Sequence, residues 1–252
     1  MKRWSVAALL ASAMLVPQAG AQAPEERPAI ERVPVRDEAG RIDAEVGILA
    51  FTQAKSDVRP VTFVIGGGPG TSSAYLNLGA LGPSRIGFDG AASSLRPLAV
   101  NDETWLAFTD LVFVDPPGTG QGRLVARDAK AKERVWSVEG DVHLLADAIA
   151  SWLRKHDRSS SPKILVGQSY GGLRVPRLAE ALHHRHGIAP NGLILVSPIL
   201  DYGWRYHAST SPLSFMALLP SFAAARMESE GWFDADKLNA VQDYARTGFL
   251  DD

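Results

Sequence analysis

Four short apolar runs constrain the fold of this chain more than any other feature. They are VTFVI at 61–65, LVFVD at 111–115, KILVG at 163–167 and LILVS at 193–197, each ending at or followed by Gly, Asp or Ser. Runs that are apolar throughout are typical of strands buried on both faces, as in parallel sheets. Helical stretches lie between the last three runs, so the sequence predicts a doubly wound α/β sheet.

The two connecting helices are predicted from periodicity and from end signals. Apolar residues recur at helical spacing over 137–156, where Ser137 is a candidate cap. A second helix is expected over 173–187, ending at Gly187. Its Pro176 is compatible with a helix only near the first turn.

The chain before and after these elements has a different pattern. Alternating apolar and polar residues on either side of Ala39 and Gly40 predict an N-terminal β-hairpin. From Tyr202 onward the sequence is rich in aromatic residues and loosely helical, and no further strand is expected.

Composition excludes several classes of function. The chain has 252 residues, of which 46% are hydrophobic, and this is enough for one sizeable core. Its 26 basic and 28 acidic residues are interspersed, which gives no reason to expect a nucleic-acid partner. The absence of cysteine excludes disulfides, thiolate metal sites and a cysteine nucleophile.

The N-terminal segment has the layout of a secretory signal peptide. Lys2 and Arg3 precede an apolar segment at about 6–16, and small residues follow, with cleavage favoured after Ala21. The segment is shorter than the ~20 residues of a membrane-spanning helix, so a stable membrane anchor is the less favoured interpretation. We therefore expect a periplasmic or secreted protein whose domain occupies 22–252.

Loops at the carboxyl ends of strands are where an open α/β sheet places its chemistry. The loop GGGPGTSS at 66–73 lets backbone N–H groups approach a ligand, but the glycines alone are weak evidence. The loop DPPGTGQG at 115–122 is partly similar to a nucleotide-triphosphate loop. It has Gln121 and Gly122 where such a loop needs Lys and Ser or Thr, so a tight turn is favoured over an ATP site.

A third loop carries a candidate nucleophile. The segment GQSYG, Gly167 to Gly171, places Ser169 between a predicted strand and a predicted helix. In a nucleophile elbow the serine sits on a sharp turn, and the N–H of the next residue, here Tyr170, faces a developing oxyanion. The alternative is a serine that caps the following helix.

Four motifs in this order resemble the serine carboxypeptidase family, especially its bacterial secreted members. They are GGGPGTSS, LGALGPSRI, DLVFVDPPGTGQGR and GQSYGGLRVP, and the resemblance runs from about Val33 to Asp201. It implies an α/β-hydrolase fold, with a mostly parallel sheet and a helical cap inserted after the sixth strand. Residues of about 202–252 would be the beginning of that cap.

The resemblance also implies roles for individual residues. Ser169 would be the nucleophile, the backbone N–H groups of Gly68 and Tyr170 would form the oxyanion hole, and Gly67 and Gln168 would contact substrate. No cofactor and no metal are implied.

Substrate recognition departs from the family pattern at two positions. Family carboxypeptidases hold the peptide carboxylate with an Asn and a Glu, and Gly66 and Gln168 stand at those positions. An amide can still donate to a carboxylate, but glycine has no side chain to contribute. Exopeptidase specificity is therefore left open.

The family's triad also needs an Asp and a His in loops beyond the cap, and no residue before Asp252 matches them. His207 is the only histidine expected near the crevice, and Asp201 is expected to be structural. The other histidines are interpreted as helix-end cations or as half-buried helical residues rather than as a metal site: His143, His156, His183, His184 and His186. We therefore expect an incomplete sequence with a bare sheet edge at 193–197, and a nearly inactive 252-residue chain.

Three functions remain open at this point. The leading one is a serine-type, carboxypeptidase-like peptidase that acts on peptides through an acyl-enzyme at Ser169. The second keeps the nucleophile but uses a small ester or acyl donor as substrate. The third is a non-catalytic binding protein with an α/β-hydrolase-like fold.

Overall fold

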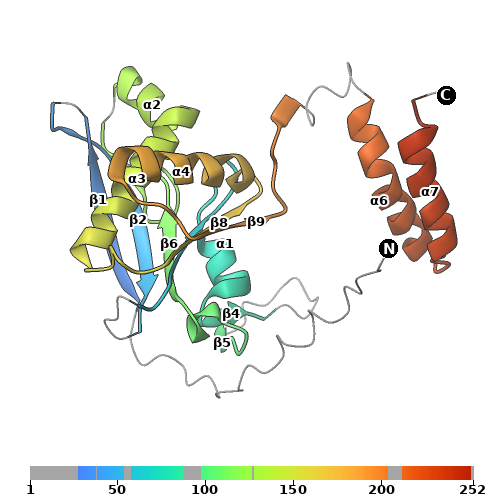
Figure 1. Cartoon of the computed structure of the whole chain (residues 1–252), viewed down its shortest axis with the longest axis horizontal. Coiled ribbons are helices and arrows are strands. Elements are labelled where there is room, and N and C mark those ends of the chain that lie inside the picture. The colour runs from blue at the N-terminus through green and yellow to red at the C-terminus, as the bar shows by residue number, and fades with distance from the viewer. Residues whose placement is uncertain are drawn as a thin grey trace, which may run out of the picture. The chain divides into compact units, whose positions relative to one another are not determined.

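The structure is a computed structural model that describes residues 28–37, 39–53, 58–87, 98–126, 128–203 and 212–250. The chain divides into two compact units, Met1–Pro198 and Ile199–Asp252 (Figure 1). The predicted signal segment at 1–21 and His207 lie outside the described residues.

The first unit is built on a mixed sheet of seven strands. The strand order is β1-β2-β6-β3-β8-β9, and β7 pairs with β2. β1 to β2 and β2 to β6 are antiparallel pairs, whereas β6, β3, β8 and β9 run parallel. The bounds are β1 Ala29–Arg36, β2 Ile42–Phe51, β3 Val61–Ile65, β6 Asp110–Asp115, β7 Arg123–Leu124, β8 Lys163–Gln168 and β9 Gly192–Val196. The predicted hairpin, the four predicted strands and the α/β class are confirmed.

The register of the central strands brings the three sequence loops together. Ile65, at the end of β3, lies level with Val114 of β6 and with Gly167 of β8. Parallel strands that end level with one another deliver their following loops to one edge of the sheet. The glycine loop at 66–73, the loop at 115–122 and the turn at Ser169 therefore share this edge.

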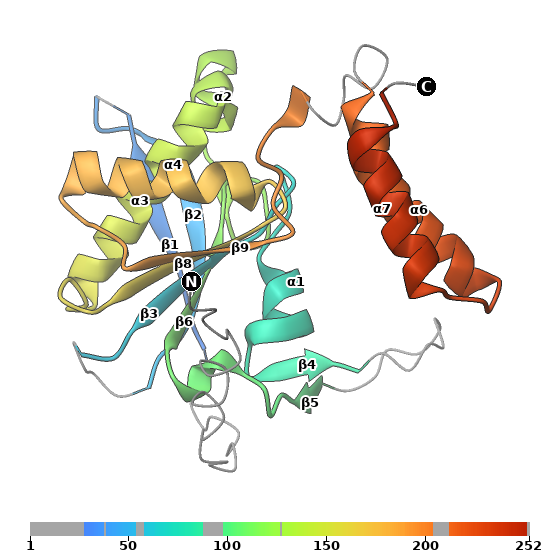
Figure 2. The same cartoon turned by 45° about the vertical axis from the view of Figure 1, so that its right-hand side comes forward.

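Helices cover both faces of the sheet (Figure 1, Figure 2). α2 (Ala129–Trp136), α3 (Val138–Lys155) and α4 (Gly171–His186) lie on one face, where α3 and α4 pack over the larger core cluster. The other face carries α1 (Ala74–Leu76), η2 (Asn77–Leu81), η3 (Trp105–Ala107) and the short hairpin of β4 (Ser84–Ile86) and β5 (Leu98–Val100). The cap at Ser137 is confirmed, because its side chain accepts from the N–H of Gly140 at 2.9 Å.

The ends of α4 test the prediction for the second helix. Gly187 ends the helix with φ +66°, the left-handed conformation that glycine adopts without strain. The helix begins at Gly171, two residues before the predicted start, so Pro176 is its sixth residue and lies beyond the first turn.

The prediction that all four apolar runs are buried on both faces is wrong for β9. β3 and β6 are buried throughout, but Leu193, Ile194 and Val196 of β9 are 42%, 38% and 37% exposed. Among the described residues β9 pairs with β8 alone and is therefore an edge strand. An apolar strand at an exposed sheet edge can pair with a strand of another molecule.

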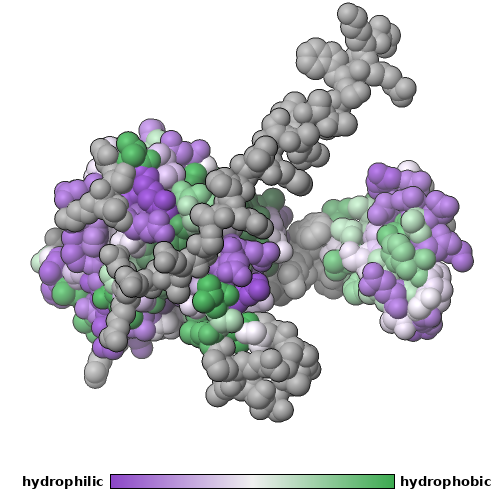
Figure 3. Space-filling view, turned by 90° about the horizontal axis from the view of Figure 1, so that it is seen from below, coloured by the Kyte–Doolittle hydropathy of each residue, from purple (hydrophilic) through white to green (hydrophobic). Residues whose placement is uncertain are grey.

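The second unit is a pair of helices, α6 (Leu213–Ser229) and α7 (Ala235–Thr247). Asp234 caps α7 by accepting from the N–H groups of Asp236 and Lys237, each at 3.0 Å. Hydrophobic surface is visible on this pair at the right of Figure 3. Its exposed large apolar side chains include Phe215, Leu218, Phe222 and Phe233. Within the described ranges, no helix is both long enough and apolar enough to cross a bilayer.

Candidate active site at the strand ends

Ser169 sits on a strained turn between β8 and α4. Its φ is +55°, a conformation that residues other than glycine adopt rarely and at a cost. Its backbone N–H donates to Val196 O at 2.9 Å, and its carbonyl accepts from Gly172 N at 2.9 Å. Ser169 does not take the helix-capping role, because Tyr170 is the N-cap residue of α4 and no side-chain cap bond is made there. The backbone has the form of a nucleophile elbow.

The two glycines of GQSYG have different local surroundings. A Cβ on Gly167 would lie 2.5 Å from Val175 Cγ2 and 2.7 Å from Gly171 O, closer than real Cβ contacts. A Cβ on Gly171 would have Ile65 O, at 3.9 Å, as its nearest neighbour outside the local helix. Close packing of β8 against α4 therefore requires glycine at Gly167 and leaves room for a methyl group at Gly171.

The glycine loop packs directly on this elbow. A Cβ on Gly67 would lie 2.5 Å from Gln168 O, 2.9 Å from Ser169 Cβ and 3.3 Å from Tyr170 N. Only a residue without a side chain lets two backbones come this close. The structure therefore places Gly67 and Gln168 beside Ser169, and Gly68, with φ +103°, follows in the same loop.

Gly66 is also enclosed by its own loop. A Cβ there would lie 2.8 Å from Ser72 O and 2.9 Å from Thr71 O. The loop is folded tightly over this position, so an asparagine side chain would require it to open. At Gly66, where the family pattern has asparagine, the backbone of this chain therefore leaves no space for a side chain.

Asp115 fastens the glycine loop to the neighbouring loop. Its Oδ1 accepts from the N–H and the hydroxyl of Ser73 at 2.7 and 2.8 Å, and its Oδ2 accepts from Gln121 N at 2.9 Å. Backbone bonds from Thr119 N to Pro116 O and from Gly122 N to Thr119 O, at 3.0 and 2.7 Å, close tight turns in the second loop. The expectation of a tight turn at 115–122 is confirmed.

A buried ion pair lies behind the elbow. Arg174 of α4 is 2% exposed, and its Nε donates to Asp141 Oδ2 of α3 at 2.6 Å. Burial raises the pKa of Asp141, and the charge and hydrogen bonds of Arg174, which lower the pKa, only partly offset that effect. Sequence reasoning missed both residues, although each is a charged residue on the buried face of an amphipathic helix.

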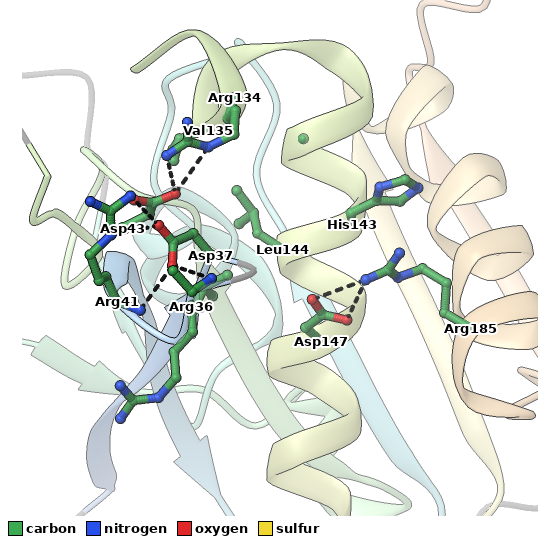
Figure 4. Close-up of a pocket in the computed structure, with 13 residues that line it drawn as sticks. Arg36, Asp37, Arg41, Asp43, Arg134, Val135, His143, Leu144, Asp147 and Arg185 are labelled. Carbon is green, nitrogen blue, oxygen red and sulfur yellow. Dashed lines mark hydrogen bonds and ion pairs between the residues drawn. The ribbon is translucent and has the colours of Figure 1, made fainter. Parts of the chain in front are cut away.

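The cavity in Figure 4 is separate from this site. Its volume is about 520 Å³, and it is lined by the turn between β1 and β2, parts of α2 and α3, and one residue of α4. Two of the arginines on its wall are paired with carboxylates, Arg134 with Asp43 at 2.7 Å and Arg185 with Asp147 at 3.2 Å. None of its lining residues belongs to the elbow or to the glycine loop. The cavity is therefore lined largely by charged side chains and does not contain the candidate nucleophile.

Histidines of the described residues have partners away from Ser169. His156 lies 2.8 Å from Glu31 and stacks on Trp152, and His186 lies 2.8 Å from Asp147. His143 faces Glu139 on α3 at 3.9 Å, and the rings of His183 and His184 contact each other. Over the described parts of the chain, no group of three or more His, Cys, Asp or Glu could hold a metal ion. Asp201 accepts from Gly203 N at 2.8 Å, as a local turn residue does.

Comparison with known families decides what this arrangement belongs to. The model of the family described as serine carboxypeptidase matches residues 49–242, which is more than half of the chain. The chain belongs to the serine carboxypeptidase family. The match extends beyond Asp201, where the motif resemblance ends, and reaches into α7.

Relatives of this family member include plant proteins. Serine carboxypeptidase-like 2 of Arabidopsis thaliana is 28% identical over 150 residues, covering 57% of this chain and 33% of its own length. Serine carboxypeptidase-like 41 of the same plant is 29% identical over 170 residues, covering 62% and 33%. This family member therefore spans about a third of the length of these curated relatives.

A solved structure agrees with the fold of this family member. The prohormone-processing carboxypeptidase Kex1Δp of Saccharomyces cerevisiae is similar with a TM-score of 0.59 and 22% identity. The match covers 88% of this chain and 48% of that protein. The likeness supports the α/β-hydrolase fold predicted from the sequence.

Proposed function

We propose that this protein is a serine-type, carboxypeptidase-like peptidase that works through an acyl-enzyme on Ser169. The serine oxygen attacks the acyl carbon and gives its proton to a base, and the leaving amine then takes up that proton. The backbone N–H groups of Gly68 and Tyr170 hold the oxyanion, and Gly67 and Gln168 contact the substrate. Family membership and the strained φ of +55° at Ser169 are the main support.

Packing of the glycine loop on the elbow supports the proposed oxyanion hole. A Cβ on Gly67 would lie 2.9 Å from Ser169 Cβ and 3.3 Å from Tyr170 N, so the glycine loop packs closely against the elbow. A donor aimed at a developing oxyanion contributes ~10²–10³ in rate. The proposal therefore assigns much of the rate enhancement to the backbone of two loops.

An ester or small acyl donor is the second candidate substrate, and the enclosure of Gly66 favours it. With no side chain at this position, the site has one fewer group to bind a free carboxylate. Rates on a blocked dipeptide and on its C-terminal amide distinguish the two. A carboxypeptidase prefers the free acid, whereas equal rates favour the ester or acyl donor.

Localisation and domain organisation are part of the same proposal. We assign residues 1–21 to a secretory signal, which places the protein in the periplasm or outside the cell. Residues from about 202 form the beginning of a helical cap. Composition gives no reason to expect a nucleic-acid partner, and we propose a peptide or a small acyl compound as the substrate.

Chemical rescue tests the nucleophile with a base that is added from solution. A fluorophosphonate probe forms a bond from the Ser169 oxygen to phosphorus, fluoride leaves, and added imidazole accepts the serine proton. We expect labelling of the purified protein at Ser169, with a rate that rises with imidazole concentration and is abolished in Ser169→Ala. Peptide mapping by mass spectrometry identifies the labelled residue. Absence of label on Ser169 at every imidazole concentration would favour a non-catalytic binding protein.

A further inference from the structure

The guanidinium of Arg174 contacts three segments that meet at the proposed active site. Nε and Nη2 donate to the carboxylate of Asp141 at 2.6 and 3.3 Å, and Nη1 donates to Gly66 O at 2.8 Å. The guanidinium carbon also lies 4.7 Å from the centre of the Tyr170 ring. One buried side chain therefore touches α3, the glycine loop and the residue that follows Ser169.

The bond to Gly66 O has a geometric consequence for the next amide. The carbonyl of Gly66 and the N–H of Gly67 belong to the same planar trans peptide and point in opposite directions. Holding Gly66 O toward α4 therefore fixes the plane in which the chain enters Gly67 and Gly68. Glycine backbones have the widest conformational freedom, so a loop that begins with three glycines needs such an external anchor.

A contribution to stability alone does not account for this arrangement. Buried ion pairs often contribute no more than well-packed apolar residues would, because desolvation offsets their attraction. A second pair, Arg185 with Asp147 at 3.2 Å, already joins α4 to α3 and is partly exposed. What Arg174 adds is a planar fork that can hold a carboxylate and a carbonyl in fixed directions at once.

We propose that Arg174, held by Asp141, is a positioning residue that sets the orientation of the glycine loop and of Tyr170 around the oxyanion of the acylation step. This rests on the proposed function, because it concerns the same oxyanion hole. The side chain acts through Gly66 and Tyr170 and makes no contact with substrate. It lies in the first turn of α4, five residues after Ser169 in the sequence, and its Nη1 faces the glycine loop.

The test compares Arg174→Lys with Arg185→Lys. Lysine keeps the charge but has no fork, so at Arg174 it cannot hold Asp141 and Gly66 O together. Arg185→Lys alters a pair between the same two helices and is the matched control. Asp141→Asn is the second variant, which keeps the shape of the side chain and removes its charge.

Two measurements read out loop orientation. The first is the maximal rate constant of imidazole-assisted fluorophosphonate labelling at Ser169, at a temperature where every variant is folded. We expect this rate constant to fall about 10–100-fold in Arg174→Lys, which is no more than the loss of one oxyanion donor would cause. The probe concentration at half-saturation should be nearly unchanged. The second is hydrogen exchange of the amides in 66–73, which we expect to be faster in Arg174→Lys and unchanged in Arg185→Lys.

The outcomes separate this inference from the proposed function. If wild-type Ser169 is not labelled, the proposed function fails and this inference fails with it. If wild-type Ser169 is labelled and Arg174→Lys labels at the same rate, the inference alone is overturned. It is also overturned if Arg185→Lys slows labelling equally, because Arg174 would then only join two helices. Should Arg174→Lys not fold, the labelling rate of Asp141→Asn decides the question. We expect that rate to fall about 3–10-fold, which is less than the loss of a whole oxyanion donor would cause.

Discussion

The two glycines of the GQSYG motif should respond in opposite ways to substitution by alanine. A methyl group on Gly167 would lie 2.5 Å from Val175 Cγ2 and 2.7 Å from Gly171 O, so β8 and α4 would have to separate. Overpacking of this kind destabilises by about 1–3 kcal/mol. At Gly171 the nearest atom outside the local helix is 3.9 Å away, and alanine in a helix is favoured over glycine by about 0.5–1 kcal/mol.

The free energies of unfolding of Gly167→Ala and Gly171→Ala should therefore differ by about 1.5–4 kcal/mol, with the first below wild type and the second at or above it. For a domain of this size that corresponds to melting temperatures about 3–15 °C apart. Urea unfolding gives the free energies and calorimetry gives the melting temperatures. Labelling of Ser169 should survive in Gly171→Ala. Equal destabilisation by the two substitutions would refute the packing argument, since both glycines would then be required by the turn.

Three further predictions concern other parts of the first unit. Asp115→Ala leaves the N–H and hydroxyl of Ser73 and the N–H of Gln121 without their acceptor. Urea unfolding should therefore show a free energy of unfolding that is lower by about 2–4 kcal/mol. An unchanged free energy of unfolding would mean that Asp115 does not join the loops. Burial raises the pKa of Glu31, but hydrogen bonds from Lys155 and His156 outweigh it and hold the pKa below its usual value. That stabilisation is present above the unfolded pKa and is lost as the pH falls through the folded pKa. Urea unfolding should therefore give Glu31→Gln a lower free energy of unfolding than wild type at pH 7 and a nearly equal one near pH 2. A difference between the two proteins that persists near pH 2 would contradict the ion pair. Ile194→Lys places a charge on the exposed edge strand β9, and light scattering should show less self-association than for wild type, whereas an unchanged mass would exclude this edge as the contact.

Local patterns were sufficient to predict the sheet and the turn that carries Ser169. Apolar runs gave the strands to within one residue, Ser137 and Gly187 gave helix ends, and the glycines around Ser169 indicated its turn. These signals are local in the sequence, because strand propensity, helix ends and turns depend mainly on adjacent residues. The apolar composition of β9 predicted its burial wrongly, because burial depends on which strands lie beside it. The bare sheet edge expected at 193–197 is confirmed within the described residues.

The residues that hold the loops together could not be found from the sequence. Asp115 binds Ser73, and Arg174 binds Asp141 and Gly66. The two residues of each pair are at least 33 positions apart in the sequence. Nothing near them in the sequence identifies the partner, and a charged residue in an apolar segment indicates only that some partner exists. The enclosure of Gly66 by its own loop was equally hidden, because it depends on the path of the loop up to Ser72.

A crystal structure of the fluorophosphonate adduct tests the central claim most directly. The proposed mechanism predicts phosphorus bonded to Ser169 Oγ and a phosphoryl oxygen about 2.7–3.1 Å from the amide nitrogens of both Gly68 and Tyr170. An adduct on another serine, or a phosphoryl oxygen turned away from both amides, would contradict it.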